Sequence, residues 1–192
     1  LPEASTIVDF EETIQLASVR SITRLWKAKN AVVAFAFVDN YNNLRFEIDP
    51  EYRSVKIEDE IVDWGIACVK KRNAESGENK TLDASFRKEN TWQIAMLKRA
   101  DFFQEDFCSL GYERSLSGPI KKHYFPSGFS LRCVRGKEEV ERLVDLHQVA
   151  FGTKNFTVEA RLAILNASEY EQDLDLVAVA PNGDLAAFCI CE

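Results

Sequence analysis

The stretch from Leu25 to Val38, LWKAKNAVVAFAFV, nearly repeats itself 153 residues later, from Ala178 to Cys191, as AVAPNGDLAAFCIC. Aligned without a gap, Val32-Val33-Ala34-Phe35 meets Leu185-Ala186-Ala187-Phe188. In both copies an apolar strand leads into a tight polar turn and then into a second, wholly apolar strand. A period of this length predicts two tandem copies of one domain, because solenoid repeats are much shorter.

The two copies are incomplete in different places. Each hairpin follows a short helical stretch that ends in Ala-Ser, at Ala17-Ser18 and at Ala167-Ser168. The best boundary is Pro126-Ser127-Gly128, which divides the chain into residues 1–126 and 127–192. The first copy lacks its opening strand and helix, and the second resembles the N-terminal half of the same unit. By the repeat period, we expect about 25 residues before Leu1 and about 86 after Glu192 to complete the copies.

Hydrophobic periodicity and turn residues predict a mixed α/β sheet, because strands come in runs with interspersed helices. The expected helices cover residues 8–18, 55–72, 92–103, 138–151 and 157–167, with a short helix that ends near Leu110. The expected strands cover residues 22–28, 31–38, 44–48, 81–86, 112–125, 129–134, 176–180 and 185–191.

Composition excludes several classes of protein. Apolar residues make up 46% of the chain and charged residues 29%, so a packed core is expected. The net charge of −7 argues against general nucleic-acid binding, which requires basic surface. No apolar run reaches the ~20 residues of a membrane span, so no membrane partner is expected.

The five cysteines form no Cys-x-x-Cys motif and lie in apolar contexts. They are expected to be buried free thiols in a reducing compartment, which predicts a cytoplasmic protein without a metal site. His147 lies on the apolar face of a predicted helix and is expected to pack in or beside the core.

Residues 46–65, FEIDPEYRSVKIEDEIVDWG, resemble the acetyl-CoA-binding segment of the GCN5-related N-acetyltransferase (GNAT) superfamily. In that family a strand ends in a hydrophobic-x-Pro-x-Tyr-Arg turn and enters a helix through Arg/Gln-x-x-Gly-x-Gly/Ala. The N–H groups at such a helix N-terminus can hold the coenzyme pyrophosphate. A second match, Phe107 to Tyr112, resembles the family's Tyr-x-x-x-Gly-Phe segment. The order of elements resembles that of tandem-domain members of the mycothiol synthase type.

The resemblance implies a GNAT-like, mostly antiparallel sheet flanked by helices, in tandem copies of which the second is incomplete. It also implies a set of coenzyme-binding positions: Phe46, Ile48, Arg53, Ser54, Val55, Lys56, Ile57 and Glu58. The one candidate general base is Glu47, on the strand that faces the acyl group in this family. An exposed strand carboxylate without a catalytic role is the competing interpretation of Glu47.

Three replacements distinguish the chain from the family pattern. Lys56 and Glu58 stand at the two glycine positions, and Glu58 is expected to repel the coenzyme pyrophosphate by about 1 kcal/mol or more. Phe107 stands where many members have the tyrosine that protonates the leaving thiolate, and phenylalanine has no proton to give. We therefore expect acetyl-CoA to bind weakly or not at all to the first copy.

The resemblance thus implies a cytoplasmic N-acetyltransferase that transfers an acetyl group from acetyl-CoA to an unknown small-molecule or other amine, with catalysis in the second copy. Whether the present chain is itself active stays open. The alternative is a non-enzymatic ligand- or protein-binding module on a decayed GNAT scaffold, favoured by Lys56, Glu58 and Phe107. Unpaired sheet edges in both incomplete copies predict pairing between copies or between chains, and so a homo-oligomer.

Overall fold

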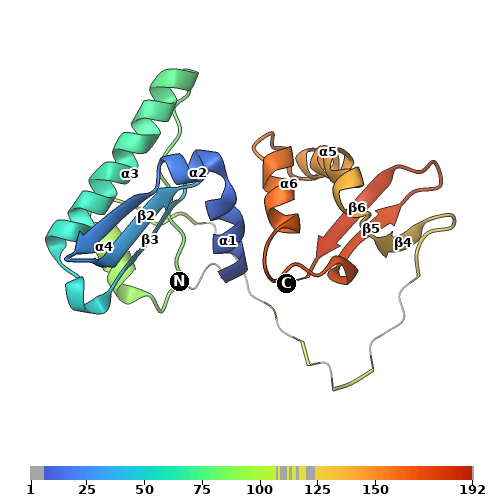
Figure 1. Cartoon of the computed structure of the whole chain (residues 1–192), viewed down its shortest axis with the longest axis horizontal. Helices are drawn as coiled ribbons and strands as arrows, with labels where there is room; N and C mark the ends of the chain where they lie inside the picture. The colour runs from blue at the N-terminus through green and yellow to red at the C-terminus, as the bar shows by residue number, and fades with distance from the viewer. Residues whose placement is uncertain are drawn as a thin grey trace.

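The computed structural model describes residues 7–106, 108, 112, 114–115, 117–119 and 124–191. We call residues 7–106 the N-terminal half and residues 124–191 the C-terminal half. Each half contains one antiparallel three-stranded sheet, and Figure 1 shows the two sheets apart from each other with helices between them. The expected pairing of strands between the two copies is therefore not found in this part of the chain.

The sheet of the N-terminal half has the strand order β1-β2-β3. Its strands are β1 (Arg24–Ala28), β2 (Ala31–Val38) and β3 (Leu44–Ile48). Asp39 sets the turn between β2 and β3, because its Oδ1 accepts the backbone N–H groups of Tyr41 and Asn43 at 2.8 and 2.9 Å. As predicted, β2 is apolar on both faces.

Both faces of this sheet are covered by helices. On one face lie α3 (Val55–Ser76) and α4 (Thr91–Arg99), whose apolar side chains join those of β2 and β3 in the main core. On the other face lie α1 (Ile7–Gln15) and α2 (Ala17–Ser21), which pack against Phe35 and Phe37. The alternation of side chains along β2 thus supplies two separate apolar layers.

The sheet of the C-terminal half has the order β4-β5-β6. Its strands are β4 (Ser130–Cys133), β5 (Asp175–Val179) and β6 (Leu185–Ile190). The helices α5 (Val140–Phe151) and α6 (Val158–Leu165) precede the β5-β6 hairpin, and 3-10 turns cover Gly136–Glu139 and Gln172–Leu174. The described part of the chain contains no helix long and apolar enough to cross a membrane.

The repeat of the sequence corresponds to a repeat of structure. The α1-β1-β2 segment of one half matches α6-β5-β6 of the other in order and in hairpin pairing. Both hairpins have a register irregularity in their first strand, between Trp26 and Lys27 and between Ala178 and Val179. The N-terminal half continues with β3, α3 and α4, whereas the C-terminal half begins with β4 and α5.

The two equivalent helices, α1 and α6, pack against each other between the sheets (Figure 1). Their contact is reciprocal: each helix carries a glutamate that accepts a backbone N–H from the Ala-Ser pair that follows the other helix. Glu159 accepts the N–H of Ala17 at 2.9 Å. Glu11 accepts the N–H and Oγ–H of Ser168 at 3.3 and 2.7 Å. Such an exchange is typical of contacts between copies related by a two-fold axis.

One predicted strand is wrong. Residues 81–86 alternate as a strand should, with Leu82, Ala84 and Phe86 packed against the main core. They form only an isolated parallel bridge, Asn43 to Asp83, because the chain then leaves the edge of β3. Thr81–Phe86 is thus a covering segment rather than a strand.

Two further predictions concern the segment between the halves: a short helix that ends near Leu110 and a strand from Tyr112 to Phe125. Much of both lies outside the described residues, and the described residues from 102 to 128 are in no helix or strand. Of the described residues in this segment, Tyr112 and Tyr124 are 89% and 86% exposed.

Candidate functional site

The centre of the candidate site is the outer edge of β3. Glu47 pairs with Phe35 of the neighbouring strand β2. The backbone N–H of Leu44 points the other way, to the outer edge, and donates to the Asp83 carbonyl at 2.7 Å. Because backbone groups alternate along an antiparallel strand, the N–H and C=O groups of Phe46 and Ile48 lie on the same outer edge as those of Leu44. Among the described residues the neighbouring segment forms only the Asn43–Asp83 bridge, yet Phe46 and Ile48 are buried, at 0% and 2% exposure.

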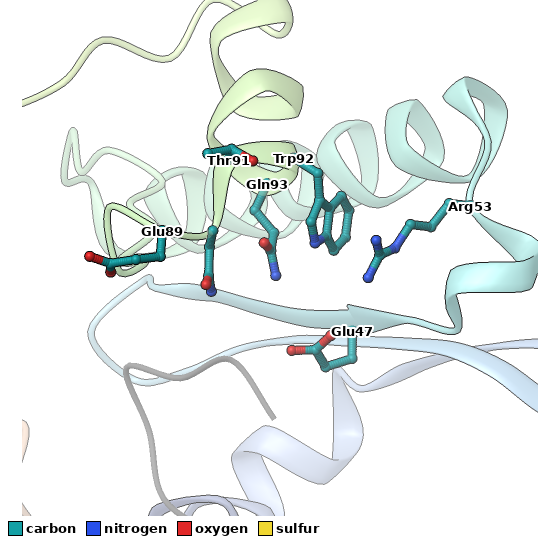
Figure 2. A pocket seen from close by; sticks show the side chains of 7 residues that line it. Glu47, Arg53, Glu89, Thr91, Trp92 and Gln93 are labelled. Atoms are coloured by element: carbon teal, nitrogen blue, oxygen red, sulfur yellow. The ribbon is translucent and has the colours of Figure 1, made fainter.

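A pocket of about 240 Å³ forms a groove beside this strand. Its lining residues come from β3, from the loop after β3 and from the start of α4: Glu47, Arg53, Glu89, Asn90, Thr91, Trp92 and Gln93. In Figure 2 Arg53, Trp92 and Gln93 extend toward the strand that carries Glu47. The structure thus brings Glu47 and Arg53, both proposed from the sequence, to one pocket.

Arg53 and Trp92 form the most defined contact of the pocket. The Arg53 guanidinium lies over the Trp92 ring, 4.1 Å from its centroid. Trp92 in turn packs edge-on against Phe46, with ring centroids 6.1 Å apart. The cation–π contact holds a positive charge at the groove although the Arg53 residue is exposed.

Gln93 is the most buried polar residue of the pocket, with 3% of its surface exposed. Its Oε1 is buried and has no hydrogen-bond partner among the described residues. Neither Trp92 nor Gln93 was predicted as a site residue. The only sequence signal was an aromatic and an amide side chain at the start of a helix, directly after the polar run Lys88-Glu89-Asn90.

Glu47 belongs to the face of β3 opposite to Phe46. The strand buries Leu44, Phe46 and Ile48 against α3 and α4, whereas Glu47 is half-buried on the alternate face. Its cross-strand partner Phe35 packs against α1. Glu47 therefore lines the pocket at the strand edge while its position on β3 favours the α1 side of the sheet.

The coenzyme-loop positions predicted from the sequence lie at the N-terminus of α3, as expected. Asp49 caps the 3-10 turn Pro50–Tyr52, and Ser54 caps α3 through a 3.4 Å bond from the Ile57 N–H to its Oγ. Val55 and Lys56 are exposed in the first turn, and Ile57 packs against the main core. The helix thus begins with its own side-chain cap at the place where a bound anion would be held.

Glu58 has a partner that the sequence did not reveal. Its Oε2 accepts a hydrogen bond from Arg99 Nη2 of α4 at 2.6 Å, and Asp59 Oδ1 lies 3.3 Å from the same nitrogen. The hydrogen bond that Arg99 donates to Glu58 is the largest cause of a raised pKa at Arg99. The carboxylate expected to repel a pyrophosphate is thus engaged by an arginine from a neighbouring helix.

Phe107, the proposed counterpart of the family's tyrosine, lies outside the described residues. A second segment, Leu97 to Phe102, has the spacing of the Tyr-x-x-x-Gly-Phe pattern at the end of α4. Asp101 stands at its glycine position with φ of 61°, in the left-handed region that favours glycine. Leu97 then stands at the tyrosine position, and leucine cannot donate a proton either.

Other groups with reactive side chains lie outside this pocket. No cluster of three or more potential metal-ligating side chains exists among the described residues. All five cysteines are free as predicted, but Cys108, Cys189 and Cys191 are exposed rather than buried. The prediction of burial is wrong for Cys189, because α5 packs against the face of β6 that carries Phe188 and the next residue of a strand points to the other face.

His147 packs as predicted. Its ring stacks against Phe156, Phe151 and Phe188, with centroids 3.9, 4.5 and 5.6 Å away. Burial, with a smaller effect of the nearby Arg161, lowers the pKa of His147 below its usual value. The histidine therefore stays neutral to lower pH in an aromatic cluster, as a core residue does.

Comparison with known proteins gives a likeness of structure but not of sequence. No protein-family model matches the chain, and no curated protein sequence matches it. A solved structure, the GCN5-related N-acetyltransferase from Sphaerobacter thermophilus, matches 88% of this chain with a TM-score of 0.51 and 18% identity. The chain spans 56% of the length of that protein. At this identity the likeness shows the fold: a mixed α/β, GNAT-like arrangement of antiparallel sheets flanked by helices.

Proposed function

We propose that this chain is part of a GNAT-type N-acyltransferase that transfers an acetyl group from acetyl-CoA to an amine. The observation that carries the proposal is the strand-turn-helix at β3 and α3, in which an edge strand leads through a 3-10 turn into a helix N-terminus. The likeness of the fold to a GCN5-related N-acetyltransferase supports it. The acceptor amine is an unidentified small molecule or side chain.

The reaction in such a site is a direct transfer. The neutral amine attacks the thioester carbonyl, an N–H of the strand edge stabilises the developing oxyanion, and the C–S bond breaks to release the coenzyme thiolate. A base takes the proton that the amine nitrogen loses, and the thiolate takes a proton from a nearby acid or from water. In the N-terminal half Glu47 is the candidate base.

The tandem arrangement, with units at residues 1–126 and 127–192 and a layout like that of mycothiol synthase, belongs to the proposal. It is supported by the matching α1-β1-β2 and α6-β5-β6 segments and by the reciprocal contacts of Glu11 and Glu159. In this arrangement the first unit shapes the acceptor pocket or serves as a scaffold, and the second unit carries catalysis.

Weak coenzyme binding by the first unit follows from its loop. Side chains at Lys56 and Glu58 stand where glycines let phosphates approach the backbone. Ser54 already satisfies one N–H at the helix start. Neither Leu97 nor Phe107 can protonate a thiolate. The first unit therefore lacks both a phosphate-binding loop and a general acid.

Calorimetry with acetyl-CoA tests this proposal on the Lys56→Gly/Glu58→Gly variant. The variant opens the loop and frees Arg99 from Glu58, so acetyl-CoA should bind about tenfold more tightly or better than to the unaltered chain. Glu75→Gly in the last turns of α3 is the matched control, since it removes a carboxylate far from the loop. Tight acetyl-CoA binding by the unaltered chain, or no gain in the double variant, would refute the proposed role of this loop.

The second candidate function is a non-enzymatic binding module on the same scaffold. It is favoured by the combined loss of both loop glycines and of the proton donor. A panel of amines with acetyl-CoA, followed by free-thiol release, separates the two candidates. Coenzyme-dependent thiol release supports the acyltransferase, and its absence together with ligand binding supports the module.

Localisation and self-association are also proposals. We place the protein in the cytoplasm because its cysteines are free. We expect chains to pair through β6, which pairs only with β5 in the described part of the molecule. Size-exclusion chromatography with light scattering should show a dimer or larger species, and a stable monomer at high concentration would refute the pairing.

A further inference from the structure

We propose that the pocket between β3 and α4 binds a small carboxylate that also carries an amide group, such as an N-acyl amino acid or the last residue of a peptide. This goes beyond the proposed acyl transfer, because the ligand needs no coenzyme. Three features of the pocket carry the proposal: an uncapped helix start, a buried amide without a partner and a cation held on an aromatic ring.

The start of α4 offers N–H donors to an anion. Asn90 occupies the N-cap position of this nine-residue helix, but its side chain makes no capping hydrogen bond. The first N–H groups of a helix have no partner within the helix, and the helix dipole adds a partial positive charge there. The N–H groups of Trp92 and Gln93 therefore face the pocket side of α4 without a side-chain cap.

Arg53 provides the second attraction for an anion. Its guanidinium is held by the Trp92 ring at 4.1 Å, and it forms no ion pair with any described residue. A planar guanidinium binds a carboxylate through two parallel hydrogen bonds. The arginine and the helix start lie on the same pocket, so one carboxylate can meet both.

Gln93 is the reason to expect an amide group in the ligand. Its side chain is 97% buried, since 3% is exposed, yet Oε1 has no partner among the residues that the structure describes. Leaving a buried acceptor unsatisfied costs about 1–3 kcal/mol, which a ligand N–H would recover. Figure 2 shows the Gln93 amide directed toward β3. A ligand amide placed there can donate its N–H to the glutamine oxygen.

The charges and the volume of the pocket limit the charge and the size of the ligand. Glu47 and Glu89 line it beside the single cation Arg53, so a ligand with several phosphates is disfavoured. The volume of about 240 Å³ lies below the range of about 300–1,000 Å³ that is usual for drug-sized ligands. One carboxylate and one amide match both the size and the charge.

The experiment is a titration of the whole chain with N-acetylglycine, followed through the Trp92 indole N–H signal in ¹H–¹⁵N spectra. Saturable shifts are expected at Trp92 and Gln93. N-acetylglycinamide, which lacks the carboxylate, should bind at least about tenfold more weakly. Equal binding of the two compounds, or no saturable shift with N-acetylglycine, would overturn the proposal.

Three variants locate the site. Arg53→Gln should weaken N-acetylglycine binding about tenfold, and Gln93→Leu about fivefold or more. Lys88→Gln, the matched charge control, removes a neighbouring cation that pairs with Glu89 at 3.8 Å but does not line the pocket, and should change binding less than about twofold. Unchanged binding in Arg53→Gln, or an equal loss in Lys88→Gln, would refute the assignment.

Stability of the ligand-free Gln93→Leu variant separates a binding role from a structural one. Leucine has no unsatisfied acceptor, so the unfolding temperature should stay the same or rise. A clear fall would mean that Gln93 supports the fold and not a ligand. These results are independent of the acetyl-CoA experiment, because failure of the loop variant to gain coenzyme leaves the N-acetylglycine titration unchanged.

Discussion

The strands β2 and β6 have nearly the same sequence but different surroundings. Ala34 of β2 is 3% exposed, whereas the aligned Ala187 of β6 is exposed. The difference comes from the neighbours: β2 lies between β1 and β3 and is covered by helices on both faces, while β6 pairs only with β5 among the described elements. Burial is thus decided by the elements that pack around the hairpin and not by the hairpin itself.

The largest effect is expected from one substitution made at both aligned positions. Ala34→Asp buries an uncompensated carboxylate and should lower the free energy of unfolding of the N-terminal half by about 4 kcal/mol or more. Ala187→Asp should change stability by less than about 0.5 kcal/mol. Urea unfolding followed by tryptophan fluorescence reports the first variant, because all three tryptophans, Trp26, Trp64 and Trp92, lie in the N-terminal half.

Circular dichroism, which follows both halves, provides the control for the second variant. If Ala187→Asp is as harmful as Ala34→Asp, some element covers β6 in solution and the contrast between the two strands is wrong.

A second test concerns a buried ion pair that only the C-terminal half contains. Arg161 of α6 forms an ion pair with Asp175 of β5, and Asp175 also accepts a hydrogen bond from the Tyr170 hydroxyl at 2.8 Å. In the other half the residue aligned with Asp175 is the apolar Ile22. Asp175→Ala should cost about 3–5 kcal/mol, because it leaves the arginine buried without a counter-charge.

The double variant Arg161→Met/Asp175→Leu separates charge from packing. It should be clearly more stable than Asp175→Ala, because no unpaired charge remains buried. Equal thermal unfolding temperatures for the two variants would show that the loss comes from packing alone.

Acid should lower the stability of the C-terminal half, because the Glu139 carboxylate becomes protonated. Its hydrogen bonds from Arg132, at 2.7 and 2.5 Å, are the largest cause that lowers the pKa of Glu139 to about 2, against the opposing effect of burial. A depressed carboxyl pKa stabilises the fold fully above the unfolded value of 4.5 and loses this contribution as the pH falls toward about 2.

The contribution of Glu139 to stability is on the order of 2–3 kcal/mol. In Arg132→Gln this pH dependence should shrink, which unfolding curves at pH 5, 4 and 3 would reveal. An unaltered pH dependence in the variant would exclude Arg132 as the cause.

The smallest effects are expected at the contact between α1 and α6. Glu11→Ala and Glu159→Ala should each cost about 1 kcal/mol, because each removes exposed hydrogen bonds to the other half. The two variants should also separate the unfolding of the halves into two transitions. Retention of one cooperative transition in the double variant would show that the apolar contact alone couples the halves.

The sequence predicted the hairpins, the strand-turn-helix at β3 and the order of helices well, because short-range patterns determine them. The groove was harder to foresee. Glu47 and Arg53 were identified on the family pattern, but Trp92 and Gln93 reach the same pocket only because residues 81–86 leave the edge of β3. The partner of Glu58 was also hidden, because Arg99 follows it by 41 residues on another helix.

The reciprocal contact of α1 and α6 has a consequence for the strength that this interface needs. Both partners belong to one polypeptide, so their association is governed by an effective concentration and not by the number of molecules in the cell. Contacts as slight as two glutamates and a small apolar patch can then keep the halves together. The same surfaces on separate chains would dissociate, so cutting the chain between residues 106 and 124 should release the halves without unfolding either of them.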